Sequence, residues 1–287
     1  MKALFISLLI LANGLNHSFG QVEKISYRNW ENCYRLKNKK CEVIIGVSCG
    51  GRVLSFSIAG KSIIYENETQ NGRLLNDWQK EWFDPDAGRF DYGPEKITQP
   101  IHSHSWMGKW NPEITGNYSL KLTSMADSAL GLQSDREFVL NSDSAILTIH
   151  QTARNISDKN LVRHFWGRTL LKPNGVLWMP LHPESRFENG WGRFLWNPDR
   201  IKPNPATDGR IQISKNNFRF YATGKTIKGG TNSPKGWMAY VLDNLVFVKQ
   251  FRVYPDEDYS GSDHMTTIFY SNGKFVELDP CSPFRAE

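Results

Sequence analysis

Short apolar runs recur along the chain, alternate with polar positions and are separated by turn-forming residues. Residues 41–47 and 52–58 are two such runs, and Gly50-Gly51 lies between them. Alternation places successive side chains on opposite faces of a strand, and glycine pairs are typical of the turns that connect antiparallel strands. The same pattern predicts strands at residues 62–65, 118–123, 145–152, 161–171, 176–179, 212–214, 218–222, 237–242, 245–253, 265–270 and 274–278.

Helical periodicity is nearly absent. Only residues 72–82, where Trp78 and Trp82 lie four positions apart, favour a short helix. Many strands with turns between them and few helices predict an all-β protein, built as a sandwich or a barrel. Because no internal repeat and no low-complexity linker interrupts residues 21–287, we expect them to form a single domain.

Two irregular stretches, residues 66–112 and 182–208, interrupt the strand pattern. Long insertions between strands usually carry function. Six of the ten tryptophans lie in these stretches: Trp78, Trp82, Trp106, Trp110, Trp191 and Trp196. Tryptophan either fills a core or stacks on a ligand, and this placement favours irregular Trp-rich loops over a ligand-binding surface.

The first twenty residues have the pattern of a secretory signal peptide. Lys2 gives a positive start, residues 3–12 are apolar, and Ser18-Phe19-Gly20 places small residues at a cleavage site. We therefore expect a secreted or periplasmic protein. The apolar stretch is too short to span a bilayer, and no later run approaches the ~18 apolar residues of a membrane helix, so no integral membrane segment is expected.

Composition narrows the class further. The chain has 287 residues, of which 39% are hydrophobic and 22% charged, with a formal net charge of +6. These values exclude a disordered, coiled-coil or collagen-like chain. Basic residues are scattered among acidic ones apart from a short group at residues 35–40, and together with export this argues against a nucleic-acid partner.

Four cysteines would enter an oxidising compartment after export. Cys33 and Cys41 bracket a basic turn and could close a hairpin, while Cys49 and Cys281 could join the two ends of the fold. Four cysteines allow three pairings, and buried free thiols are the alternative. Because no C-x-x-C spacing occurs, a metal site built from these cysteines is not expected.

Four segments stand in an order that is informative as a set. The first is GGRVLSF at residues 50–56, followed by a second strand that ends as IIYEN at residues 63–67. The next is GRFDYGPE at residues 88–95. A strand then reaches His-Phe-Trp at the end of residues 155–166, and FVELDP occupies residues 275–280.

By these segments the chain resembles the galactose mutarotase-like (aldose 1-epimerase-like) superfamily, and most closely an uncharacterised bacterial branch of it, a domain of unknown function. The resemblance implies a large antiparallel β-sandwich, the galactose mutarotase-like supersandwich, that binds a sugar or oligosaccharide in a cleft on one face. It implies neither a cofactor nor a metal. The pair of Asn and Arg with which true aldose epimerases hold a sugar hydroxyl has no counterpart in this sequence.

The resemblance also implies a catalytic pair. Interconverting sugar anomers requires one group that removes the proton of the anomeric hydroxyl and another that protonates the ring oxygen. The matching positions are Glu277 as the base and His164 as the acid. A carboxylate with a raised pKa and a histidine both titrate near neutral pH. The alternatives are that Glu277 pairs with a neighbouring basic residue and that His164 is a core histidine.

Six further residues are candidates for contacts with the sugar: Arg89, Glu95, His104, Trp110, Trp166 and His264. Arginine offers a planar set of donors to hydroxyl groups, and tryptophan offers an apolar face to the sugar ring. An internal salt bridge is the alternative for Arg89 and Glu95, and a solvated turn is the alternative for His264. His102 and His104 would share one face of a strand, which would also suit a metal pair.

Two functions follow from these residues. One is an exported aldose 1-epimerase-like isomerase acting on a sugar, and the other is a non-catalytic carbohydrate-binding module accessory to polysaccharide degradation. The placement of His164 and Glu277 separates them, because acid-base catalysis requires both groups to reach one sugar ring. The sequence leaves the identity of the sugar and the oligomeric state open.

Overall fold

The computed structural model describes residues 21–93, 103–194, 201–203 and 208–286. The predicted signal peptide at residues 1–20 and the candidate Glu95 lie outside them. Within the described residues, no helix has the length and apolar character needed to cross a membrane.

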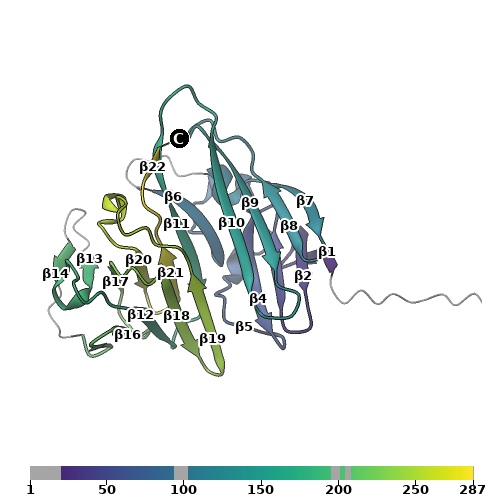
Figure 1. The fold of residues 1–287 in the computed structure, drawn as a ribbon. Helices are drawn as coiled ribbons and strands as arrows, with labels where there is room; N and C mark the ends of the chain where they lie inside the picture. Colours follow the sequence, from purple (N-terminus) through teal and green to yellow (C-terminus); the bar gives the residue numbers. More distant parts are fainter. Residues whose placement is uncertain (1–20, 94–102, 195–200, 204–207, 287) are drawn as a thin grey trace, which may run out of the picture.

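A large antiparallel sheet runs through the whole molecule (Figure 1). It has 13 strands, with the order β1-β2-β3-β4-β6-β11-β21-β20-β17-β13-β14, while β5 pairs with β4 and β22 with β11. Its strands are β1 (Gln21–Tyr27), β2 (Trp30–Lys37), β3 (Glu42–Gly46), β4 (Arg52–Ile58), β5 (Lys61–Ser62), β6 (Gly88–Gly93), β11 (Val162–Leu171), β13 (Gly192–Phe194), β14 (Ile201–Pro203), β17 (Ile227–Thr231), β20 (Thr267–Ser271), β21 (Val276–Pro280) and β22 (Arg285–Ala286).

Two smaller antiparallel sheets pack against the large one. The first consists of β7 (Asn111–Gly116), β8 (Ser119–Thr123), β9 (Leu132–Leu140) and β10 (Leu147–Asn155). The second consists of β12 (Val176–Pro180), β15 (Ile211–Ser214), β16 (Asn217–Tyr221), β18 (Trp237–Leu242) and β19 (Leu245–Gln250). One buried cluster includes residues from all three sheets, among them Ile45, Phe138, Met238 and Leu278. This architecture confirms the predicted all-β sandwich.

Helices are few and short. The helix expected within residues 72–82 is present as α1 (Leu75–Lys80), and a second helix, α2 (Ser103–Met107), lies in the same irregular stretch. Three 3₁₀ helices span Glu68–Gln70, Glu188–Gly190 and Ser260–Ser262. Strand β9 was not predicted from the sequence. Its inward positions include Ser134 and Arg136, which are 2% exposed and interrupt the alternation of apolar and polar residues.

Most tryptophans of the irregular stretches belong to the core. Trp78, Trp106, Trp110 and Trp191 are at most 8% exposed, and only Trp82, at 58%, lies open to solvent. Trp196 falls outside the described residues. The expectation that these tryptophans cover a ligand surface is therefore wrong for four of the six, because the two facing sheets need large apolar side chains between them.

The Gly50-Gly51-Arg52 segment holds the two layers together. Gly50 and Gly51 have φ angles of 86° and 59°, and a Cβ atom on Gly50 would overlap the carbonyl group of Trp106. Their carbonyl oxygens accept hydrogen bonds from the guanidinium of Arg136, which β9 supplies. Only glycine adopts this backbone conformation without strain, so the glycine pair has a structural role.

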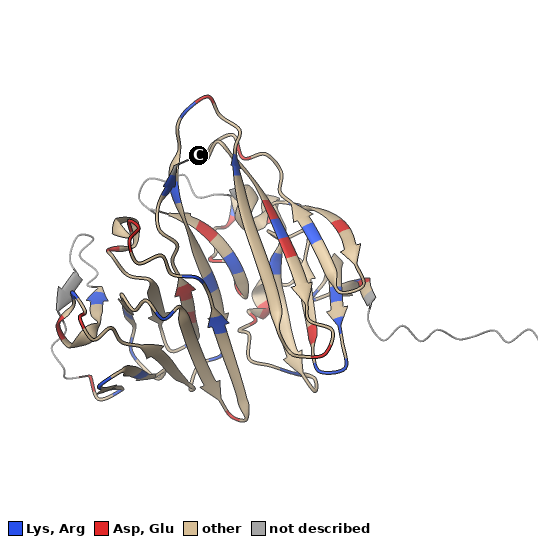
Figure 2. Ribbon diagram, in the orientation of Figure 1, with Lys and Arg blue, Asp and Glu red and all other residues tan. Residues whose placement is uncertain are grey.

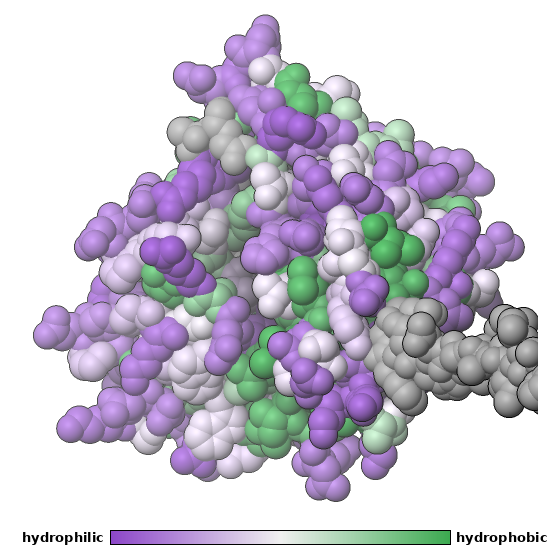
Figure 3. Space-filling model, turned by 45° about the vertical axis from the view of Figure 1, so that its right-hand side comes forward, coloured by the Kyte–Doolittle hydropathy of each residue, from purple (hydrophilic) through white to green (hydrophobic). Residues whose placement is uncertain are grey.

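The outer surface is mixed. On the face drawn in Figure 3, apolar residues form separate spots among polar ones.

Cys33, Cys41, Cys49 and Cys281 are all buried free thiols. The disulfide pairings considered from the sequence are therefore not formed in this structure.

Candidate functional site

A row of polar side chains crosses the centre of the large sheet. In the strand register Arg168 lies opposite Arg89, Glu277 opposite Tyr270, and Tyr270 opposite Lys228. Directly opposed residues of antiparallel strands share one face of the sheet. Glu277 lies opposite Leu170, and Arg168 is two positions before Leu170 on the same strand, so Arg168 and Glu277 also share that face. Strands far apart in the sequence therefore place five residues on one face, and we call them the polar row: Arg89, Arg168, Lys228, Tyr270 and Glu277. Figure 2 shows the acidic and basic positions of these central strands.

Arg168 is the centre of an ion-pair network at one end of the polar row. Its guanidinium lies 2.5 Å from a carboxylate oxygen of Glu277 and 3.2 Å from oxygens of both Asp84 and Asp91. Arg89 binds the same two aspartates at 2.6 and 3.1 Å. Three carboxylates thus surround two guanidinium groups, and Asp84, with 31% of its side chain exposed, connects the network to solvent.

The network fixes the charge of its members. Burial alone would raise the pKa of Asp84, but the guanidinium groups of Arg89 and Arg168 lower it below its ordinary value. Burial opposes the charge of Arg168, while Glu277, Asp84 and Asp91 raise its pKa well above the ordinary value. Arg168 is therefore a permanent cation beside Glu277. Only one carboxylate oxygen of Glu277, Oε1, is hydrogen-bonded within the described residues, so Oε2 is left to accept another donor.

Asp279 lies two positions beyond Glu277 on the same face of β21. Its carboxyl group is completely buried, and neither oxygen has a hydrogen-bond partner among the described residues. Burial, reinforced by the charge of Glu277, raises its pKa well above the ordinary value. This favours a protonated carboxyl beneath the polar row, because a buried charge without hydrogen bonds is costly.

Lys249 reaches the same strands from the opposite layer. Its ammonium donates to the carbonyl oxygens of Gly167 and Leu278 and to Oγ1 of Thr169, each at 2.9 Å. Burial lowers its pKa to about 8. All three ammonium protons have acceptors, so Lys249 holds β11, β21 and β19 together and is not available to a ligand.

An aromatic group lies beside the charged network. The half-buried Trp166 ring has the ammonium of Lys228 at 4.7 Å and the guanidinium carbon of Arg168 at 5.8 Å from its centre. Lys228 also lies 5.2 Å from the centre of the Phe194 ring. The indole N–H of Trp166 and Nε of Arg168 are buried without hydrogen-bond partners within the described part of the chain. Aromatic faces next to charged hydrogen-bonding groups match the alternating apolar and polar surface of a sugar.

The structure places the predicted acid, His164, in a tight apolar site. It is 4% exposed and lies edge-on to Phe284, with 5.3 Å between the ring centres. A Cβ atom on either Gly93 or Gly261 would collide with its imidazole ring. Burial lowers the pKa of His164, and neither ring nitrogen has a hydrogen-bond partner among the described residues.

The predicted pair, His164 and Glu277, is not brought together. Glu277 lies opposite Leu170, which follows His164 by six positions on β11. At about 3.3 Å per residue, the strand separates the two backbone positions by ~20 Å. Glu277, itself 3% exposed, meets Arg168 instead. A single sugar ring does not bridge such a distance.

The other candidates are dispersed. Arg89 is buried in the ion-pair network, and Trp110 is completely buried with the guanidinium of Arg136 stacked 4.5 Å from its ring centre. His104 was expected on a strand but lies in α2, where it is half-buried, and His102 falls outside the described residues. His264 is exposed in a turn. Trp166 is the candidate that borders the network around Glu277.

Several residues of this site were not among the site residues predicted from the sequence: Asp84, Asp91, Arg168, Lys228, Tyr270 and Asp279. One signal could have found some of them. Trp166 with Arg168, and Glu277 with Asp279, place polar or amphipathic residues two positions apart, and so on one face of a predicted strand. No group of three or more residues able to hold a metal ion occurs in the part of the chain that the structure describes.

No family model matches the sequence, and no curated protein matches it. Several solved structures are similar to it. A galactose mutarotase-like protein from Lactobacillus casei ATCC 334 is 10% identical, with a TM-score of 0.57 and 87% of each chain covered. The Slr1438 protein from Synechocystis sp. PCC 6803 is 13% identical, with a TM-score of 0.58 over 90% of this chain and 88% of that one.

A third similar structure is a galactose mutarotase-like protein from Clostridium acetobutylicum. It is 9% identical, with a TM-score of 0.53, and the match covers 93% of this chain and 94% of that one. Such matches extend over nearly the whole of both chains, so they concern the complete sandwich and not one sheet of it. The chain therefore has the galactose mutarotase-like fold that its four sequence segments predicted.

Proposed function

We propose that this protein binds a carbohydrate at the polar row, with Trp166, Arg168 and Glu277 as the principal contacts. The observation that carries the proposal is the Arg168–Glu277 pair, 2.5 Å apart, beside the half-buried ring of Trp166. The similar solved structures named as galactose mutarotase-like supply the sugar as the ligand class.

The chemistry of the three residues supports a sugar. The free oxygen of Glu277, Oε2, accepts a hydrogen bond from a hydroxyl group, and the second oxygen stays fixed by Arg168. A carboxylate held by a guanidinium is pre-oriented, so it loses little side-chain entropy on binding. The face of Trp166 receives the apolar C–H side of the ring, and the ammonium of Lys228 beside it donates to further hydroxyls.

We propose binding without anomer interconversion by His164 and Glu277. Their separation of six strand positions supports the carbohydrate-binding alternative, because general acid-base catalysis needs both groups within hydrogen-bond reach of one substrate. We also propose, from residues 1–20, that the protein is exported and meets glycans outside the cytoplasm.

A glycan array followed by calorimetry tests the binding. We expect saturable binding of at least one glycan, loss of that binding in Trp166→Ala, and weakening by about tenfold to a hundredfold in Glu277→Gln. The matched controls are Ile114→Ala, which shortens an apolar side chain that is 55% exposed, and Glu113→Gln, both on the exposed strand β7 of the four-stranded sheet. Both controls should bind as the unchanged protein does. Binding to no glycan, or unchanged binding in Trp166→Ala, would overturn the proposal.

Polarimetry tests the absence of catalysis. Freshly dissolved galactose and glucose should approach their equilibrium rotations at the uncatalysed rate in the presence of the protein. Acceleration that disappears in both Glu277→Gln and His164→Ala would establish the epimerase instead and would refute the binding-only proposal.

A further inference from the structure

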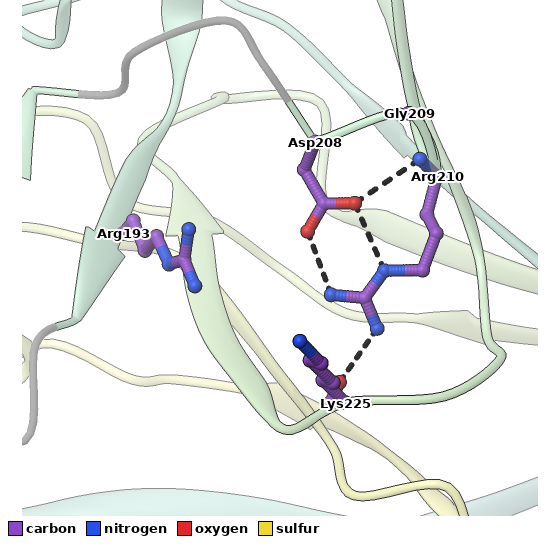
Figure 4. Close-up of a pocket in the computed structure, with 5 residues that line it drawn as sticks. All are labelled: Arg193, Asp208, Gly209, Arg210 and Lys225. Carbon is purple, nitrogen blue, oxygen red and sulfur yellow. Dashed lines mark hydrogen bonds and ion pairs between the residues drawn. The ribbon is translucent and has the colours of Figure 1, made fainter.

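A polar pocket lies away from the polar row. It has a volume of about 330 Å³ and is lined by Arg193, Asp208, Gly209, Arg210 and Lys225 (Figure 4). This volume is within the range of small-ligand sites. The pocket forms where strand β13 of the large sheet meets the segment that leads into β15 of the five-stranded sheet.

The strand geometry separates this pocket from the polar row. Phe194, the neighbour of Arg193 on β13, contacts Lys228 of the polar row. Successive residues of a strand point to opposite faces, so Arg193 points away from Lys228 and toward the five-stranded sheet. A ligand in the pocket would thus lie on the other side of the large sheet from Trp166.

Arg210 and Asp208 form a fixed wall of the pocket. The guanidinium binds both carboxylate oxygens, with Nε 2.9 Å from Oδ1 and Nη2 2.6 Å from Oδ2. Its Nη1 donates to the carbonyl oxygens of Thr223 and Lys225, both at 2.6 Å. Hydrogen bonds from Arg210 lower the pKa of Asp208, which therefore stays ionised and paired. This ion pair is internally neutral and holds the pocket open in one geometry.

Two further cations line the pocket and have no partner among the described residues. Neither the Arg193 guanidinium nor the Lys225 ammonium makes a hydrogen bond or ion pair with the described residues. Figure 4 shows the Arg193 guanidinium directed toward Asp208 and Arg210, and Lys225 is an exposed residue of the lining. The Arg193 backbone is fixed by pairing with β14 on one side and β17 on the other. Among the described residues of the lining, one carboxylate faces three cations, so the net charge is +2, and Arg193 contributes a planar guanidinium suited to an oxyanion.

We propose that this pocket binds an oxyanion, the carboxylate or sulfate group of an acidic sugar. Arg193 provides the planar donor pair, Lys225 provides the second charge, and the remaining N–H of Arg210 Nη2 completes the site. The binding of an oxyanion follows from the pocket alone, whereas the sugar as its carrier rests on the proposed function.

Calorimetric titration with glucuronate, glucose 6-sulfate and glucose, at constant ionic strength, tests the proposal. We expect saturable one-to-one binding of at least one acidic sugar and none of glucose at this pocket. Binding of glucuronate alone assigns a carboxylate site, and binding of glucose 6-sulfate alone assigns a sulfate site. Arg193→Gln should weaken the binding about tenfold, because it removes a charge-assisted hydrogen-bond pair.

Two control variants distinguish binding in this pocket from non-specific binding to positive charge and from binding at the polar row. Arg219→Gln removes an arginine that stacks on Trp178 outside the pocket, and it should leave the affinity unchanged. Trp166→Ala should also leave it unchanged, even though it abolishes binding at the polar row. Absence of saturable binding, or equal weakening by Arg219→Gln and Arg193→Gln, would overturn the oxyanion site. Loss of binding in Trp166→Ala alone would overturn it too and would assign the acidic sugar to the polar row.

Discussion

Two arginine–carboxylate clusters lie in the large sheet, and they differ in how completely their charges are paired. In the first, Asp86 lies between Arg52 and Arg28, at 2.8 and 2.6 Å, and also accepts from the backbone N–H of Asn67 at 2.6 Å. Both arginines stack on Trp30, with 5.2 and 5.5 Å to the ring centre. Glu66 adds a second carboxylate, 3.8 Å from Arg28. We call this first cluster closed because its carboxylate oxygens are occupied within the fold, while Nη1 of Arg28 and Nη2 of Arg52 are buried without partners among the described residues.

The second cluster, around Arg168 and Glu277, is open. It has three carboxylates for two guanidinium groups, a buried carboxyl in Asp279 without partners, and partial exposure at Asp84. Both clusters keep buried arginine N–H groups without partners among the described residues. The difference lies in the carboxylates: those of the first cluster are occupied within the fold, whereas the second keeps an unoccupied oxygen on Glu277 and partial exposure at Asp84, which suits a ligand. The comparison assigns a structural role to the Asp86 cluster and a binding role to the Arg168 cluster.

The largest expected effect comes from breaking the closed cluster. Asp86→Ala leaves Arg52 buried without a counter-charge and leaves Arg28 only the more distant Glu66, so we expect it to lower the free energy of unfolding by about 3–5 kcal/mol. Denaturant unfolding followed by tryptophan fluorescence measures this change, with the exposed Glu113→Gln as control. A loss no larger than that of the control would remove the structural distinction between the two clusters.

The open cluster should respond in the opposite sense. Glu277→Gln should weaken glycan binding about tenfold to a hundredfold, the contribution of a hydrogen bond to a charged group. Its cost in stability should be smaller than that of Asp86→Ala, because Asp84 and Asp91 still neutralise Arg168. Calorimetry and denaturant unfolding of the same variant give both values. A variant that loses stability but keeps its affinity would contradict the binding role.

The pH dependence of the free energy of unfolding tests whether the open cluster contains a buried, protonated carboxyl at Asp279. Its folded-state pKa is raised, so folding takes up a proton, and stability falls as the pH rises from about 4, the unfolded value, toward the folded one. Asp279→Asn removes this titration, so the stability of the variant should decline less between pH 4 and 7. Asp243→Asn, in an exposed turn, serves as control. Equal slopes for Asp279→Asn and the unchanged protein would show that the buried carboxyl does not titrate in this interval.

The smallest effect on stability is expected outside both clusters. Arg193→Gln removes a guanidinium without partners in the described residues, and we expect its free energy of unfolding to stay within about 0.5 kcal/mol of the unchanged protein. Thermal unfolding measures it. A substantial loss would mean that Arg193 supports the fold and is not held free for a ligand.

The segments that carried the family resemblance explain why the fold was easier to predict than the site. Arg52, Asn67 and the glycine pair meet in the structure at Asp86 and Arg136, where they fix the sheet. These contacts join residues 19 to 85 positions apart, but the backbone and charge requirements at each end leave a readable local pattern. Glu277 came from the same resemblance, but its partner Arg168 was not identified, since only strand pairing brings these two residues together.

The sequence by itself determined the alternating strands, the absence of long helices, the glycine turns and the order of motifs, because these depend on residues close together in the chain. The tertiary structure alone decided which polar residues meet. It placed His164 at one end of β11, aligned Glu277 with Arg168 at the other, and buried most of the loop tryptophans. Strand order and register across a 13-stranded sheet set these contacts, and both are properties of the whole fold that no local pattern records.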